Sequence, residues 1–178
     1  KLTFFGDLNI TSIILVVFSF MILMFIMGLV KKNNGVVDVG WGLGFILIAL
    51  FTFIKNGSYT LLQLIGTTLV IVWGLRLSLH IYARNKSKPE DFRYANWRKQ
   101  WGKWLNLRAF FQVYMLQGFL MLLIAISIIV INSYSYSRFG VVSIIGFLLW
   151  VFGFIFESVG DYQLKKHLKK SKSIMQTG

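Results

Sequence analysis

Residues 10–30 read ITSIILVVFSFMILMFIMGLV, an apolar run without a single charged side chain. A run of roughly 20 mostly apolar residues is long enough for an α-helix to cross a bilayer. This run is too long for the core of a signal peptide, and no small-residue cleavage pattern follows it. We therefore expect a membrane span here rather than a cleaved leader.

The rest of the chain has the same character. Of its 178 residues, 56% are hydrophobic and 17% are aromatic, and cysteine is absent. The alternating pattern of a membrane β-barrel does not occur. The sequence thus predicts an all-α integral membrane protein that forms one helical domain over residues 1–178. Its five spans are expected at residues 9–30, 36–54, 59–82, 110–131 and 139–164.

The longest polar stretch, residues 85–107, combines aromatic and basic side chains at helical spacing. Tyr94, Trp97, Trp101 and Trp104 recur every three or four residues, with Arg98, Lys99 and Lys103 between them. This pattern predicts an amphipathic helix at about residues 92–106 that lies in the headgroup region of the membrane. Nucleic-acid binding is disfavoured, because membrane spans flank the segment closely.

The formal net charge of +13 follows the predicted topology. Lysine and arginine are concentrated in cytoplasmic segments, so their distribution places the N-terminus outside and the C-terminus inside. Only Lys1, Lys55 and Arg138 fall on the outer side. The inner side, which we expect to attract anionic lipids, carries Lys31, Lys32, Arg84, Lys86, Lys88, Arg93, Arg98, Lys99, Lys103, Arg108, Lys165, Lys166, Lys169, Lys170 and Lys172.

Several ionisable residues lie at the inner ends of the spans, where they are functional candidates by default. Arg76, His80 and Arg84 are four residues apart and share one helix face. Glu157 and Asp161 share a face in the same way, and Arg76 and His80 are their natural partners. We expect these groups to form one polar site. The alternative to a functional site is a purely structural ion pair among these groups. For Asp38, the alternative to a functional role is that it caps a helix at the membrane interface.

Two further patterns bear on packing and metals. Gly40 and Gly44 have the small-xxx-small spacing that permits close helix approach, within one chain or between two, so the oligomeric state stays open. Neither an HxxxH nor an ExxH pattern occurs, so no metal site is predicted.

Four blocks in order carry a resemblance to a known family. They are VDVGWG at 37–42, WGLR at 73–76 with His80 and Asn85 after it, EDFRY at 90–94, and FESVGDYQL at 156–164. Together they resemble bacterial members of the steroid 5α-reductase-like membrane proteins, in the branch catalogued as a domain of unknown function. The resemblance implies a fold of about seven helices in the bacterial cytoplasmic membrane. It also implies NADPH as cofactor and hydride transfer to a carbon–carbon double bond conjugated with a carbonyl.

The resemblance also assigns residues. Those expected to bind the cofactor are Arg76, His80, Arg84, Asn85, Arg93, Tyr94, Glu157 and Asp161. Asp38, Trp41 and Trp73 are expected on the substrate side or in structural roles, and no catalytic residue is assigned. At the position of Glu157, the resemblance implies an asparagine in the steroid-specific enzymes. The glutamate and tyrosine that hold a steroid's ketone have no clear match, so the steroid substrate is not carried over.

One further block of the family is expected after the basic segment. There the family continues with a glycine-led Tyr/Ser-Arg-His-Pro-Asn-Tyr motif and two more spans, whereas this sequence ends at Gly178. The sequence is therefore expected either to belong to a longer chain or to lack these residues, which in the family help to bind the cofactor's phosphates.

The leading hypothesis is an NADPH-dependent reductase of a hydrophobic enone, sterol-like or isoprenoid. An isoprenylcysteine-type methyltransferase that uses S-adenosylmethionine is the rival enzyme. A non-catalytic, lipid-binding membrane protein is the alternative from another class. The basic inner face suits a phosphate-rich dinucleotide better than S-adenosylmethionine.

Overall fold

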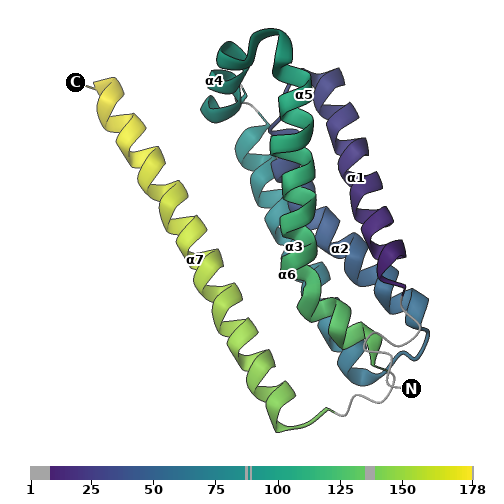
Figure 1. Ribbon diagram of the computed structural model, residues 1–178. Helices are drawn as coiled ribbons and strands as arrows, with labels where there is room; N and C mark the ends of the chain where they lie inside the picture. The colour runs from purple at the N-terminus through teal and green to yellow at the C-terminus, as the bar shows by residue number, and fades with distance from the viewer. Residues whose placement is uncertain (1–8, 87, 89, 135–138, 178) are drawn as a thin grey trace. The chain divides into compact units, whose positions relative to one another are not determined.

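A computed structural model describes residues 9–86, 88, 90–134 and 139–177 (Figure 1). The chain divides into two compact units, Lys1–Ser137 and Arg138–Gly178. The described part is helical throughout and contains five helices long and apolar enough to cross a membrane, which confirms the predicted fold class. The bounds differ most at the fourth predicted span, where the helical run extends over Phe92–Ser133, and at the fifth, where the helix continues from Val141 to Thr177.

The first unit contains most of the elements. Four long helices lie alongside one another, and two short helices gather at one end of them (Figure 1). The elements are α1 (Ile10–Lys31), α2 (Val36–Asn56), α3 (Leu61–Asn85), α4 (Phe92–Trp101), a 3₁₀ turn (Gly102–Trp104), α5 (Leu105–Ala109), a π-helical segment (Phe110–Met115) and α6 (Leu116–Ser133). The second unit is the helix α7 (Val141–Thr177).

The helix predicted at residues 92–106 ends earlier, at Trp101. Gly102 follows with a φ of +46°, a left-handed value that an α-helix cannot continue through. Asp91 begins α4, because its side chain accepts a hydrogen bond from the Arg93 backbone N–H. The segment therefore consists of a short helix, a turn and a second short helix that leads into α6.

Helix α2 is the centre of the first unit and contacts α1, α3 and α6. Its glycines make these contacts possible. A Cβ at Gly42 would lie 2.2 Å from the carbonyl oxygen of Gly74, and a Cβ at Gly74 would lie 2.6 Å from that of Gly42. The two backbones thus touch directly. Gly40 and Gly44, which the sequence marked for packing, instead face Met24 of α1 and Met121 of α6.

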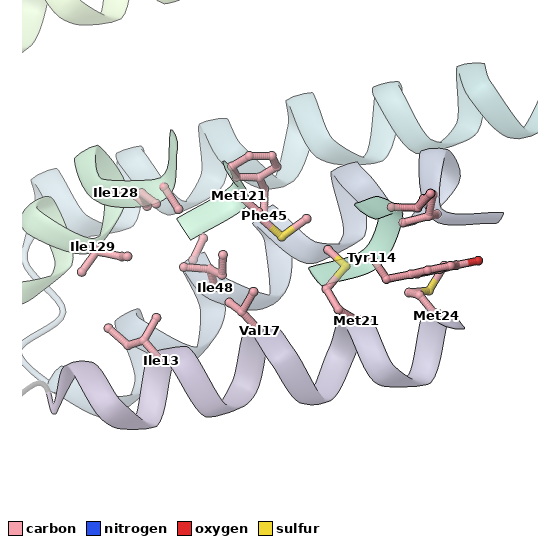
Figure 2. Close-up of a cluster of buried hydrophobic side chains, with 14 of the residues drawn as sticks. Ile13, Val17, Met21, Met24, Phe45, Ile48, Tyr114, Met121, Ile128 and Ile129 are labelled. Carbon is pink, nitrogen blue, oxygen red and sulfur yellow. The ribbon is translucent and has the colours of Figure 1, made fainter. Parts of the chain in front are cut away.

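The apolar core lies between α1, α2 and α6 (Figure 2). Helix α1 contributes one face, whose members are spaced three or four residues apart, as helix geometry requires. Buried side chains of α2, the π-helical segment and α6 meet it. The labelled residues are Ile13, Val17, Met21, Met24, Phe45, Ile48, Tyr114, Met121, Ile128 and Ile129.

A neutral polar network closes the end of the first unit away from α4. The Asn132 side chain, fully buried, donates to Ala49 O at 3.1 Å and to Thr52 Oγ1 at 2.9 Å. Gln63, equally buried, donates to the Asn132 and Tyr134 carbonyl oxygens, both at 3.2 Å. These bonds join α2, α3 and α6 through the buried side chains of Asn132 and Gln63, for which an unmade hydrogen bond would be costly.

The contact between Gly42 and Gly74 gives a direct test of the packing. Gly42→Ala forces a methyl group into backbone atoms that cannot move aside, so we expect a loss of about 1–3 kcal/mol or more in unfolding free energy. Gly66→Ala is the matched control, because its nearest neighbours are side-chain atoms of Ile128 and Ile131 at 3.4 Å. Thermal unfolding in detergent micelles measures both. Equal stability of the two variants would contradict the arrangement of α2 and α3.

Candidate functional site

The candidate site lies at the end of the first unit where α1 ends, α2 begins and α4 packs. Asp38 stands in the first turn of α2, and its Oδ1 accepts a hydrogen bond from the Tyr94 hydroxyl at 2.9 Å. Tyr94 is only 3% exposed. The side chain of Asp38 is 17% exposed. A nearly buried phenol is thus held against a carboxylate that solvent still reaches.

Arg93 links this pair to the start of α4. Its Nη2 lies 3.8 Å from Asp38 Oδ2, and its Nε donates to Asp91 Oδ1 at 3.0 Å. The Arg93 guanidinium holds the pKa of the Asp91 carboxyl below its usual range, and Arg84 of α3 acts in the same direction. The end of α3 and the start of α4 therefore lie close enough for their charges to interact.

A second cluster lies beside the first and is centred on Glu90. Its Oε1 accepts from the backbone N–H of Asn34 at 2.8 Å and from Arg98 Nη2 at 2.9 Å. Its Oε2 accepts from Arg98 Nε at 3.0 Å. Arg98 Nη2 also donates to the carbonyl oxygen of Lys32 at 3.0 Å. This cluster ties the turn between α1 and α2 to α4.

Tyr114 completes the floor of the site from the π-helical segment. Its hydroxyl, fully buried, donates to Asn34 Oδ1 at 3.1 Å. The hydroxyl occupies the space that a side chain at residue 28 would need, since a Cβ at Gly28 would lie 2.1 Å from it. π-helical segments are rare and frequently accompany functional sites.

The predicted stripe of α3 ends at the same end of the first unit (Figure 1). Arg76 and His80 are half-buried, whereas Arg84 is exposed and donates through Nε to Asn85 Oδ1 at 3.3 Å. Ser78, between the first two, faces α2 and donates to Val39 O at 2.9 Å. The stripe thus runs beside the contact that positions Asp38.

Trp41 and Trp73 have packing roles. The Trp41 ring stacks on Phe45 with centroids 5.6 Å apart, and Phe45 meets the Trp73 ring edge-on at 5.4 Å. The three rings join α2 to α3 beside the contact between Gly42 and Gly74, since Trp41 and Trp73 directly precede these glycines. The expectation of a substrate-side or structural role for Trp41 and Trp73 stays a prediction.

Glu157 and Asp161 lie one turn apart on α7, in the second unit. That helix is ordered locally by ring stacking of Trp150 on Phe154 and by the Ser158 hydroxyl, which donates to Phe154 O at 2.6 Å. The expectation that these carboxylates join Arg76 and His80 stays a prediction.

The sequence reasoning missed how Asp38 and Tyr94 meet and did not assign Asn34, Glu90, Arg98 or Tyr114. Glu90 belonged to the EDFRY block but was given no role. Asp38 and Tyr94 lie 56 residues apart, and so do Asn34 and Glu90. The equal spacing of the two pairs was available in the sequence, but only the fold shows that they face each other.

Comparison with known proteins gives one match. No curated protein matches the chain. No solved structure matches it either. The family described as "Protein of unknown function (DUF1295)" matches residues 24–178, from within α1 to the C-terminal residue. Because the match covers most of the sequence, this chain belongs to the DUF1295 family.

Proposed function

We propose that this protein is a membrane-embedded, NADPH-dependent reductase of a carbon–carbon double bond in a hydrophobic enone, sterol-like or isoprenoid. The observation that carries the proposal is the hydrogen bond from the buried Tyr94 to the partly exposed Asp38 at the basic end of the first unit. The resemblance to steroid 5α-reductase-like proteins supports the type of reaction only. Because the family's glutamate and tyrosine that hold a ketone have no clear match here, we assign the carbonyl-binding role to Asp38 and Tyr94 on their geometry, which moves Tyr94 from the cofactor side to the substrate side.

The side chains around this end suit a dinucleotide phosphate. Arg84 lies in the last turn of α3, Lys86 and Lys88 follow the helix, and all three are exposed. Guanidinium and ammonium groups bind phosphates through charge-assisted hydrogen bonds. Arg76 and His80 continue this stripe inward and would orient the nicotinamide half, with Asn85 and Arg93 beside them. Glu157 and Asp161, on α7 in the second unit, stay in the cofactor set only as the resemblance implies.

Bound NADPH would supply a hydride to the β-carbon of the enone. The chain's own part is to take up the charge that then develops on the carbonyl oxygen. Tyr94 would turn its hydroxyl proton from Asp38 to that oxygen. Asp38, protonated from solvent, would then donate to the phenol oxygen, so the bond between the two side chains would reverse its direction. Donors fixed in a site that excludes water stabilise such an oxyanion far more than solvent does. The enolate would then take up a proton from solvent at its α-carbon and return to the ketone, which completes the balance of one hydride and one proton.

The topology follows from the same charges. Basic residues crowd the end that carries α4, whereas Lys55 alone among the described lysines and arginines lies at the opposite end of the first unit. Under the positive-inside rule this end faces the cytosol, where NADPH is found, with the N-terminus outside and the C-terminus inside. The membrane would be the bacterial cytoplasmic membrane, and its lipid phase would deliver the substrate.

Cofactor titration tests the proposal first. The full-length protein in detergent micelles, titrated with NADPH, is expected to melt at higher temperature, because a ligand at 100 times its Kd stabilises the folded state by about 2.7 kcal/mol. S-adenosylmethionine is titrated in parallel. A response to S-adenosylmethionine alone would favour the methyltransferase, and a response to neither would favour a non-catalytic lipid-binding protein.

Tyr94→Phe tests the assigned role. It removes one hydroxyl from an oxyanion site, so we expect NADPH consumption with β-ionone or a 3-oxo-4-ene steroid to fall about 10²–10³-fold at unchanged NADPH affinity. The control is Tyr59→Phe, because Tyr59 is exposed and packs on Phe53 at the opposite end of the first unit. Full activity in Tyr94→Phe would exclude the phenol as the carbonyl's partner.

A further inference from the structure

Two contacts of equal spacing join the start of α2 to the segment around α4. The backbone N–H of Asn34 donates to Glu90 Oε1 at 2.8 Å, and the Tyr94 hydroxyl donates to Asp38 Oδ1 at 2.9 Å. On each segment the two members are four residues apart. The same two segments are therefore joined twice, once just before α2 and α4 begin and once within their first turns.

Glu90 accepts three hydrogen bonds, one from Asn34 and two from Arg98. Arg98 meets both carboxylate oxygens in a bidentate arrangement, which fixes orientation as well as distance. The same guanidinium reaches the carbonyl oxygen of Lys32. Lys32 has a left-handed φ of +48° at the end of α1, so a side chain holds the chain where the turn begins. Glu90 and Arg98 together therefore fix both ends of this turn.

Asn34 is also held by contacts other than the one with Glu90. Asn34 is nearly buried, and its side-chain oxygen accepts the Tyr114 hydroxyl. Its carbonyl oxygen accepts the backbone N–H of Val37, which opens the first turn of α2. Asp38 lies in that first turn. A displacement of Asn34 relative to Glu90 would therefore displace Asp38 relative to Tyr94.

We propose that Glu90 is a positioning residue: it sets the register of α4 against α2 and so aims the Tyr94 hydroxyl at Asp38. The consequence for catalysis rests on the function proposed above, whereas the positional role does not. Glu90 touches no reacting atom in this account and acts through Asn34, Arg98 and the turn between α1 and α2.

Residue-resolved amide hydrogen exchange of the full-length protein tests the positional role without any ligand. In Glu90→Ala the Asn34 N–H loses a charged acceptor, so its exchange should accelerate about 10- to 100-fold. The matched control is Asp91→Asn. It also removes one negative charge, retains a good N-cap for α4 and leaves the Asn34 contact intact. Unchanged exchange in Glu90→Ala, or equal acceleration in both variants, would overturn the proposal.

Arg98→Lys provides the test if Glu90→Ala does not fold. Lysine keeps the charge but lacks the planar fork that meets Glu90 and Lys32 together. Exchange at Asn34 should then accelerate by a smaller factor than in Glu90→Ala, and no acceleration would contradict the positioning role of Glu90.

Kinetics separate positioning from general destabilisation. With β-ionone and NADPH, Glu90→Gln should lower kcat at least about tenfold while the Kd for NADPH is unchanged, and in a Tyr94→Phe background it should have no further effect. An equal loss in both backgrounds would overturn the positioning role. If exchange at Asn34 accelerates in Glu90→Ala but NADPH neither binds nor is consumed, the reductase assignment fails and the positioning role of Glu90 stands. If NADPH binds but exchange at Asn34 does not accelerate, only the positioning role fails.

Discussion

The direct backbone contact between Gly42 of α2 and Gly74 of α3 is the constraint on which the candidate site depends. Within a bilayer, lipid tails are as apolar as leucine, so helices associate through close packing and hydrogen bonds rather than through the hydrophobic effect. One turn along α3, Ser78 adds a hydrogen bond to the carbonyl oxygen of Val39. That residue adjoins Asp38, so the contact between the helices also sets where the carboxylate stands.

The two ends of the first unit use polar groups differently. At one end Asn132, Gln63 and Thr52 are neutral, buried and bonded to one another, which suits a permanent fastening of α2, α3 and α6. At the other end the groups are charged, several are exposed, and a tyrosine is held on a carboxylate. Neutral networks within a membrane stabilise packing, whereas ionisable groups mark sites of chemistry. This difference is why the function is assigned to the end that carries α4.

Much of the architecture could be predicted from the sequence, because length and hydropathy alone determine whether a helix crosses a membrane. The start of α4 was also predictable from its aromatic spacing. Its end before Gly102 was not, since the spacing does not show that this glycine adopts a left-handed backbone conformation. The role of Gly42 was missed in favour of Gly40 and Gly44, because spacing does not say which neighbour each glycine faces.

The site itself was only partly predictable. Arg84, Asn85, Arg93 and Tyr94 were expected at one end, since the topology of successive spans requires it, and their binding roles stay predictions. The bond between Tyr94 and Asp38 depends on how α4 folds back over α2, which no local pattern encodes. Tyr114 was counted within an apolar span, where its hydroxyl gave no sign of a partner. The junction of α7 with this site stays a prediction.

A double-mutant cycle on unfolding free energy tests the central claim, that α2 and α4 build one site through Asp38 and Tyr94. Asp38→Asn and Tyr94→Phe are measured singly and together, with the same detergent and the same unfolding method. Residues in direct contact show coupling of about 0.5–3 kcal/mol, and we expect a value in that range. Strictly additive effects would mean that the two side chains do not meet, and the site as described would not exist.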